Sequence, residues 1–462
     1  MPFPIRFGGR RLDLCDTDDH AKSHQSSIPG DSAVLEMQPS ENSLAVSERL
    51  RRVSTPETNP FINNTPPMCC NSITKAIFIG VFLLPLRLVL FGPSIAMAWI
   101  LCAIATTCIP KPPKIVRDEE AGGDEEAVCR PTRAEDDVPL APWRQKLVEY
   151  TAFWWRLWLY SLSYHNFQVV GTPAPREEAR ICVGNHTSFL DIFAMYACKR
   201  FMFVAKAEVR RIPFGWQIIR AGQTLLVDRC DKKSAASARV AIEKRVRCDH
   251  KWPTMVMFPE GTCTNGTALI TFKSGAFNPG VAVQPVTISY GWDSVDPCKV
   301  YGGGPGVGGI IWRLFTSLGN TITVTFLDVY HPSEAEQRDP HLFAENVRNV
   351  MAKHLGVAVT NHSYGEVQLL LRARKLHVKG RVFPKLNLEM TNLQKILNAD
   401  CSVDDFKYFL QRFHEVSGSD GLLDRDEFLQ LMEMPENVIT RGIFDIFDVD
   451  HTGSLDFKEF MS

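Results

Sequence analysis

The sequence predicts an α/β domain in which helices cover a central sheet, preceded by an apolar segment and followed by an all-helical tail. Short runs of β-branched and aromatic residues alternate with amphipathic segments from about residue 179 onward, which is typical of such a sheet. One stretch before this region is too long and too apolar for an ordinary core helix. The last part of the chain carries an acidic loop beside a helical pattern.

Residues 1–70 are predicted to form a disordered arm, because they are rich in serine, proline, asparagine and charge. The start of the chain also lacks the apolar centre of a secretory signal. In the whole chain 51 Lys and Arg residues balance 52 Asp and Glu residues, which argues against nucleic acid as a partner. The 13 cysteines lack the spacing of a metal site or a small disulfide framework, so we expect reduced thiols facing the cytosol.

Residues 71–110 are predicted to anchor the protein in a membrane, since they are apolar almost throughout. Arg87 lies near the middle of this stretch, and an arginine at the centre of a bilayer costs roughly 2.5–3.5 kcal/mol. Two shorter helices that bend between Pro85 and Pro93 would let the guanidinium reach an interface. We therefore expect a hairpin or re-entrant anchor, with a single span as the alternative.

A charged linker is expected over residues 111–140, and the α/β domain over residues 141–385. Near the start of the domain, the stretch 150–164 places three tryptophans and several tyrosines around Arg156. This pattern fits a helix at a membrane interface and an aromatic core helix equally well.

Within the domain, the alternating pattern assigns strands and helices in turn. Functional residues in such sheets gather at the strand ends, in the turns that lead into helices. The expected strands are residues 179–185, 200–206, 223–229, 254–260, 282–290 and 322–330, and the expected helices are residues 188–199, 213–220 and 232–248.

The turn after the first of these strands carries His186 and, five positions later, Asp191. A neutral imidazole beside a carboxylate is a poised general base, because the carboxylate fixes the tautomer and stabilises the imidazolium. The spacing alone decides nothing, since the same H-x4-D recurs from His451 to Asp456. For an isolated pair, a capping aspartate beside a surface histidine is the simpler explanation.

Two further strand ends carry groups that suit a ligand. The turn Glu260-Gly261-Thr262 presents backbone N–H groups and one carboxylate. Arg229 ends another strand, where a guanidinium suits recognition of a phosphate or carboxylate. Each could be an ordinary loop with a surface charge, but three such strand ends together indicate a common site.

With these motifs, the chain resembles the glycerolipid acyltransferase superfamily, and within it the lysophospholipid acyltransferases that carry C-terminal EF-hands. The family's N-H-x4-D motif is met by residues 185–191, and its F-P-E-G-[ST] motif by residues 258–262. A proline inside an apolar strand, the fourth motif, is met by Pro285. The resemblance covers roughly residues 73–385 and the C-terminal tail, and it implies a mixed sheet flanked by helices.

The second motif of the family usually reads G-x-x-F-[IV]-x-R. Here Val227, Asp228 and Arg229 align with it, whereas Gly222 falls one residue early and Leu226 replaces the aromatic residue. This departure weakens the transfer of the glycerol-phosphate role to this segment.

The resemblance implies an enzyme that moves a fatty acyl group from acyl-CoA to the free glycerol hydroxyl of a lysophospholipid. His186 would be the general base and Asp191 its orienting carboxylate. Arg229 and the turn of Glu260, Gly261 and Thr262 would bind the acceptor. Glycerol-3-phosphate or lysophosphatidate as acceptor, or a catalytically silent calcium-responsive membrane scaffold, are the alternatives.

The family suggests a membrane of the endoplasmic reticulum or Golgi, with lipids and acyl-CoA as partners and the oligomeric state left open. Two glycosylation sequons, at residues 185–187 and 265–267, fall inside the expected site. A glycan on either would obstruct it, which favours a catalytic domain on the cytosolic face.

Residues 386–462 are predicted to form an EF-hand pair. The upstream loop, residues 416–427, has Val416 and Gly418 where carboxylates belong, so we expect it to be free of calcium. The downstream loop ends close to Ser462, which leaves a short exit helix, and we therefore expect weak calcium binding. Its expected calcium ligands are Asp448, Asp450, Thr452, Ser454, Asp456 and Glu459.

Overall fold

The structure is a computed structural model of the chain, and its described residues fall into two compact units. One unit is residues 58–367, and the other combines residues 1–57 with residues 368–462. The described residues are 5–7, 10–12, 59–109, 138–207, 209, 215–227, 232–248, 252–300, 304–375, 403–417, 421–432, 444–445, 447–448 and 452–455.

A seven-stranded mixed sheet forms the centre of the larger unit, in the order β3-β10-β9-β4-β7-β5-β6. All neighbours are parallel except β9 and β10, which are antiparallel. All six predicted strands are present, and the edge strand β3 was missed because its mostly exposed side chains give no alternating pattern. The strands are β3 (Asn166–Val170), β4 (Ile181–Gly184), β5 (Met202–Lys206), β6 (Leu225–Val227), β7 (Met255–Met257), β9 (Val283–Gly291) and β10 (Thr321–Phe326).

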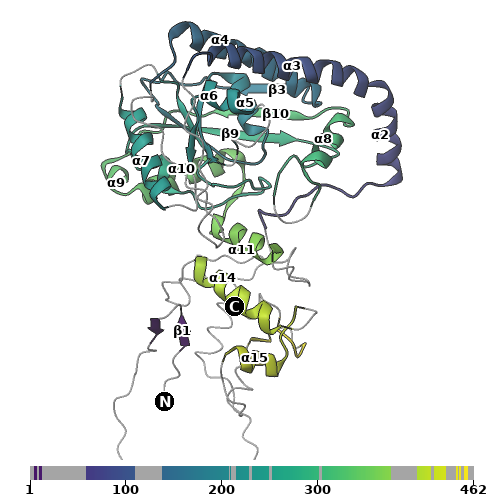
Figure 1. Ribbon diagram of the computed structural model, residues 1–462, viewed down its shortest axis with the longest axis vertical. Coiled ribbons are helices and arrows are strands. Elements are labelled where there is room, and N and C mark those ends of the chain that lie inside the picture. Colours follow the sequence, from purple (N-terminus) through teal and green to yellow (C-terminus); the bar gives the residue numbers. More distant parts are fainter. Residues whose placement is uncertain are drawn as a thin grey trace, which may run out of the picture. The chain divides into compact units, whose positions relative to one another are not determined.

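Helices cover both faces of this sheet, as Figure 1 shows. Both faces of the sheet are covered because alternate side chains of the central strand β4 are buried on opposite faces. Cys182 packs into one apolar cluster, and Ile181 and Val183 pack into the other. The three predicted helices are α5 (Asp191–Cys198), α6 (Gly215–Ala221) and α7 (Lys232–Arg247). Helix α4 (Pro142–Ser161) contains most of the stretch 150–164 that was expected to be helical. Helices that were not predicted are α8 (Val307–Phe315), α9 (Glu334–Arg338), α10 (Pro340–Leu355) and α11 (Tyr364–Lys375).

The predicted anchor forms two helices, α2 (Cys70–Phe82) and α3 (Leu84–Ala105), which break at Leu83. Among the described residues, α3 is the one helix long and apolar enough to cross a bilayer. Arg87 does not reach out to an interface. Its buried guanidinium donates to the carbonyls of Phe315, Ser317 and Leu318, at the end of α8 and just after it, so the domain itself satisfies these hydrogen-bond donors.

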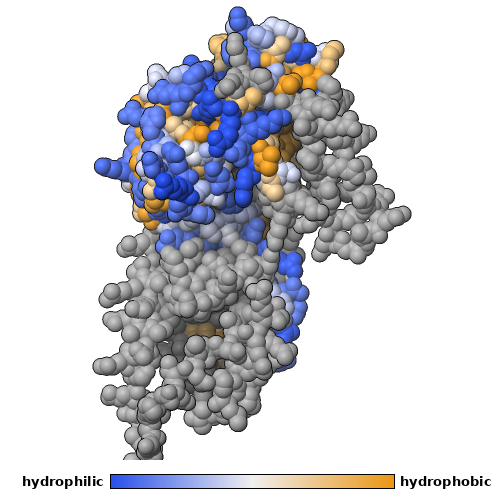
Figure 2. All heavy atoms as spheres, turned by 90° about the vertical axis from the view of Figure 1, so that its left-hand side faces the viewer, coloured by the Kyte–Doolittle hydropathy of each residue, from blue (hydrophilic) through white to orange (hydrophobic). Residues whose placement is uncertain are grey.

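Exposed apolar side chains concentrate on α2, α3 and α4, and such a surface is suited to contact with a membrane. Helix α4 combines both interpretations of the aromatic stretch. Trp155 and Trp158 are buried in the core, while Tyr150 and Phe153 are 67% and 64% exposed. By contrast, the side of the molecule shown in Figure 2 is mainly hydrophilic, with only small separate hydrophobic groups.

The smaller unit contains a short hairpin of β1 (Ile5–Phe7) and β2 (Arg10–Leu12) and the helices α14 (Val403–Val416) and α15 (Arg425–Leu431). The hairpin falls within the arm that was predicted to be disordered. The two predicted EF-hand loops meet through an antiparallel bridge between Leu423 and Leu455, with hydrogen bonds of 2.9 and 2.7 Å in the two directions.

Candidate active site

His186 and Asp191 form a hydrogen-bonded pair after the carboxyl end of β4. The Nδ1 atom of His186 lies 2.8 Å from Oδ2 of Asp191, whose side chain is fully buried. The backbone N–H groups of Thr187 and Ser188 donate to the same carboxylate oxygen at 2.8 and 2.9 Å. Asp191 therefore closes the turn and also fixes the ring, which leaves Nε2 as the nitrogen that does not contact the carboxylate.

Two aromatic side chains that the sequence did not reveal complete this arrangement. The hydroxyl of Tyr290, from β9, donates to Oδ1 of Asp191 at 2.5 Å. The ring of Phe258 stacks on the imidazole with centroids 4.5 Å apart and planes 17° apart. Gly184 is needed for this stacking, since an added Cβ would lie 3.0 Å from the Phe258 ring.

Glu260 braces the same turn from the neighbouring strand β7. Its buried carboxylate accepts the backbone N–H of His186 at 2.7 Å and the hydroxyl of Thr264 at 3.2 Å. The N–H of Thr264 returns a bond to the carbonyl of His186 at 2.9 Å. Burial raises the pKa of Glu260 to about 7, although the bond from His186 opposes the shift. The structure thus brings two of the predicted site residues, His186 and Glu260, into direct contact.

The turn after Glu260 places several polar groups near this pair. Gly261 has φ +73°, and a Cβ there would lie 3.0 Å from Nζ of Lys273. Thr262 is buried, and its hydroxyl has no hydrogen-bond partner among the described residues. Arg229 lies outside the described residues, so its predicted contact with the acceptor stays a prediction.

The sulfur of Cys263 lies 3.4 Å from Nε2 of His186. Burial of the imidazole disfavours its charged form, but the interaction with Cys263 and the hydrogen bond to Asp191 outweigh this, so the pKa of His186 is raised well above its ordinary value. The side chain of His186 is 19% exposed, so the ring is reachable from outside. The arrangement can accept a proton at Nε2 and stabilise the resulting cation.

A segment just before the anchor, residues 59–66, ties the site loops together. Asn265 donates from its backbone to the carbonyl of Pro60 at 2.8 Å and from its side chain to the carbonyls of Asn59 and Ile62, both at 2.9 Å. Asn63 donates to the carbonyl of Cys298 at 2.9 Å. The end of the predicted arm therefore packs on the loop that follows Glu260.

In the smaller unit, Asp448 occupies the first position of the predicted calcium loop. Its carboxylate accepts the backbone N–H groups of Thr452 at 2.9 Å and Gly453 at 2.8 Å, and Gly453 has φ +76°. The carbonyl of Ser454 accepts the Thr452 hydroxyl at 2.9 Å. No metal-binding cluster of His, Cys, Asp or Glu is formed by the described residues. The other predicted ligands, Asp450, Asp456 and Glu459, lie outside them.

Residues 166–289 match the sequence profile of the family described as Acyltransferase. Lysophosphatidylcholine acyltransferase 1 of Rattus norvegicus is 32% identical over 424 residues, which cover 89% of this chain and 72% of that protein. Lysophosphatidylcholine acyltransferase 2 of Homo sapiens is 30% identical over 409 residues, covering 88% of this chain and 70% of that protein. The crystal structure of the 1-acyl-sn-glycerophosphate acyltransferase PlsC from Thermotoga maritima is 22% identical, with a TM-score of 0.33, and covers 46% of this chain and 81% of that one. The chain is therefore an acyltransferase that belongs to the family of the lysophosphatidylcholine acyltransferases.

Proposed function

We propose that the protein transfers a fatty acyl group from acyl-CoA to the free glycerol hydroxyl of a lysophospholipid, with His186 as the general base. The observation that carries this proposal is the bond from Nδ1 of His186 to buried Asp191, which leaves Nε2 of this partly exposed side chain to accept a proton. Nε2 takes the hydroxyl proton while the oxygen attacks the thioester carbonyl. The carbon–sulfur bond to CoA then breaks, and the imidazolium returns its proton to the departing thiolate.

Asp191 supports this cycle by stabilising the imidazolium, and Tyr290 and two backbone N–H groups hold the carboxylate still. A base that is positioned in this way contributes typically ~10²–10⁴-fold to the rate. Holding two long substrates together contributes a separate, entropic part.

The acceptor's phosphate is proposed to lie beside the turn of Gly261 and Thr262, with Arg229 as a further ligand. Two observations support this position. The ammonium of Lys273 lies close to Gly261, and the Thr262 hydroxyl lacks a partner among the described residues. Glu260 uses its carboxylate to brace His186, so we propose that it binds the acceptor through the turn that it shapes. Glycerol-3-phosphate and lysophosphatidate carry the same phosphate and remain alternative acceptors.

We place the catalytic domain on the cytosolic face of an endoplasmic reticulum or Golgi membrane. Both sequon asparagines support this side, because their amides are used inside the protein. Asn185 is buried and donates to the carbonyl of Ile288 at 2.9 Å, and Asn265 donates to Asn59 and Ile62. A glycan on either amide would break these bonds.

The C-terminal loops are proposed to be a pair of EF-hands in which Asp448 begins the loop that binds calcium. The paired bridge of Leu423 and Leu455 and the turn closed by the Asp448 carboxylate support this proposal. Calcium would be structural or regulatory there, because acyl transfer as described needs no metal.

A panel of acceptors offered with acyl-CoA to the purified protein in membranes tests the function. We expect the lysophospholipids to be acylated most rapidly, and His186→Ala to lower kcat by about 10²–10⁴-fold. Equal transfer by both proteins would remove His186 from the mechanism. Transfer by neither protein would favour the silent scaffold.

The short distance between Cys263 and Nε2 supports a second route, in which the sulfur carries the acyl group. The thiol would give its proton to His186, and its sulfur would displace CoA from the thioester before the hydroxyl attacks the acyl-cysteine. Cys263→Ala separates the routes, since the direct route retains activity in this variant and the covalent route loses it as completely as His186→Ala does.

A further inference from the structure

A hollow lies beside the amino ends of β5 and β7, whereas His186 follows the carboxyl end of the parallel strand β4. It is a cavity of about 360 Å³ formed by α4, by the turn after α5 and by the loop that precedes β7. Thr254 precedes β7 and Phe258 follows it. At about 3.3 Å per residue, these two ends of the strand are roughly 13 Å apart. The cavity is therefore separate from the site that holds the catalytic pair.

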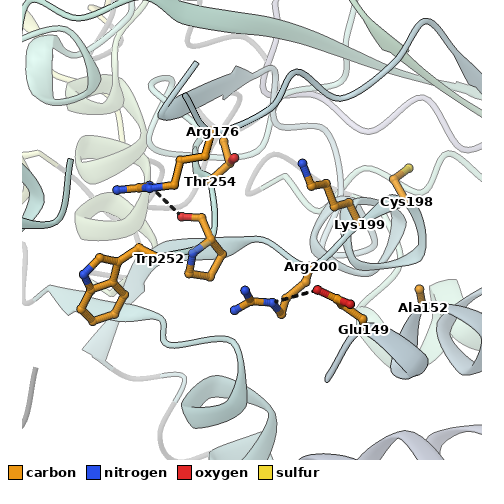
Figure 3. A pocket seen from close by; sticks show the side chains of 9 residues that line it. Glu149, Ala152, Arg176, Cys198, Lys199, Arg200, Trp252 and Thr254 are labelled. Atoms are coloured by element: carbon orange, nitrogen blue, oxygen red, sulfur yellow. Dashed lines mark hydrogen bonds and ion pairs between the residues drawn. The ribbon is translucent and has the colours of Figure 1, made fainter. Parts of the chain in front are cut away.

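Positive charge dominates the lining of this cavity. Figure 3 shows Arg176, Lys199 and Arg200 around one space, with Trp252 at its side. The one acidic side chain among the lining residues is Glu149, which is 57% exposed. Its carboxylate lies 3.8 Å from Nε of Arg200, too far for a hydrogen bond, so it neutralises the cluster only in part.

Two buried side chains in the lining, Arg200 and Thr254, have polar atoms without a hydrogen-bond partner among the described residues. The side chain of Arg200 is 8% exposed and donates from Nη2 to Gln145 at 2.9 Å, whereas its Nε and Nη1 have no hydrogen-bond partner among the described residues. The hydroxyl of Thr254 also has none, although this residue is 3% exposed. Buried donors rarely stay without a partner, least of all on a charged group.

Structural roles explain the other cations of the cluster but leave these groups unexplained. Arg176 donates to the carbonyls of Pro253 and Arg245 at 3.0 and 2.6 Å, which fixes the loop before β7. Lys199 is the C-cap of α5, and its ammonium donates to the carbonyl of Ala174 at 3.4 Å. Neither role uses the open N–H groups of Arg200, so the cavity is built for a ligand with several acceptor oxygens.

We propose that this cavity binds a phosphate group, which Arg200, Lys199 and the hydroxyl of Thr254 would contact. A phosphate monoester supplies the negative charge and the acceptor oxygens that these donors require. The anionic head group of a membrane lipid is the source that the position favours. Helix α4 contributes Glu149 and Ala152 to the lining of the cavity. The next residue after each of them, Tyr150 and Phe153, is exposed and lies about 100° further around the helix. The cavity thus lies beside a surface suited to the membrane interface.

Calorimetric titration of the full-length protein in phosphatidylcholine nanodiscs tests the proposal with two probes, short-chain phosphatidic acid and inorganic phosphate. We expect phosphatidic acid to bind and Arg200→Gln to weaken it at least tenfold. Thr254→Val keeps the charge and shape of the site and is expected to weaken binding a few-fold. This second variant keeps the proposal testable if Arg200→Gln does not fold. Binding of inorganic phosphate with the same dependence on Arg200 would support the site and identify a soluble ligand.

Two matched controls place the binding in the molecule. Arg338→Gln removes one guanidinium from an 81% exposed position, and binding should be unchanged. Lys273→Gln removes a cation from the catalytic edge, and loss of binding in this variant alone would assign the phosphate to that edge. Identical titrations of the wild type and Arg200→Gln, or no binding of either probe, would overturn the proposal. None of these outcomes depends on acyl transfer, so they leave the proposed function to its own test.

Discussion

Two buried aspartates, Asp191 in the larger unit and Asp448 in the smaller one, each close a turn through backbone hydrogen bonds, and we propose different chemistry for them. Each carboxylate accepts two backbone N–H groups within five residues of itself. Asp191 also binds the imidazole of His186 and the hydroxyl of Tyr290. The comparison shows that an aspartate can stabilise a turn through local backbone hydrogen bonds alone. Side chains from other parts of the fold then determine whether the same carboxylate can take part in an active site.

The largest expected effect comes from removing the negative charge beside His186 in the first turn. Asp191→Asn keeps an acceptor oxygen for the backbone N–H groups but cannot stabilise an imidazolium, so we expect kcat to fall about 10²–10⁴-fold. Rates of acyl transfer from radiolabelled acyl-CoA would measure this. The matched change Asp448→Asn should leave the rate without calcium within about twofold of the wild type. Equal losses in both variants would mean that both carboxylates act only on folding.

Tyr290→Phe tests whether the hydrogen bond from β9 to Asp191 contributes to catalysis. The variant removes one hydrogen bond to a charged group, typically about 1.5–3 kcal/mol, while Phe keeps the packing against Tyr164. We expect kcat to fall roughly tenfold or more, with KM for both substrates nearly unchanged. An unaltered kcat together with a lower unfolding temperature would assign Tyr290 to stability alone.

The raised pKa of His186 predicts the pH dependence of catalysis. The base must be neutral, so kcat/KM should fall as the pH drops through the pKa, and this fall should lie above the ordinary histidine value near 6.5. Losing the Asp191 charge removes one cause of the raised pKa, so the residual activity of Asp191→Asn should decline at lower pH than that of the wild type. A profile with the same midpoint in both proteins would contradict this assignment.

The two turns also show what could be predicted from the sequence. His186 and Asp191 lie five residues apart between a strand and a helix, so local periodicity was enough to place them together. The roles of Tyr290 and Phe258 depend on β9 and β7 flanking β4, and the strand order of a sheet is not written in any short stretch. The brace from Glu260 to His186 was missed for the same reason, although Glu260 itself was singled out. Arg87 looked like a membrane residue because the carbonyls that bind it lie more than two hundred positions along the chain.

The smallest effect on catalysis is expected at the second turn. In Asp448→Ala the N–H groups of Thr452 and Gly453 lose their acceptor, so the loop should lose calcium affinity at least tenfold, as calorimetry with calcium would show. Acyl transfer measured without calcium should stay within about twofold of the wild type, because this carboxylate has no imidazole beside it among the described residues. Unchanged calcium affinity would show that Asp448 only closes its turn, as a capping aspartate does. The two aspartates would then differ only in that Asp191 binds the imidazole of His186 and the hydroxyl of Tyr290.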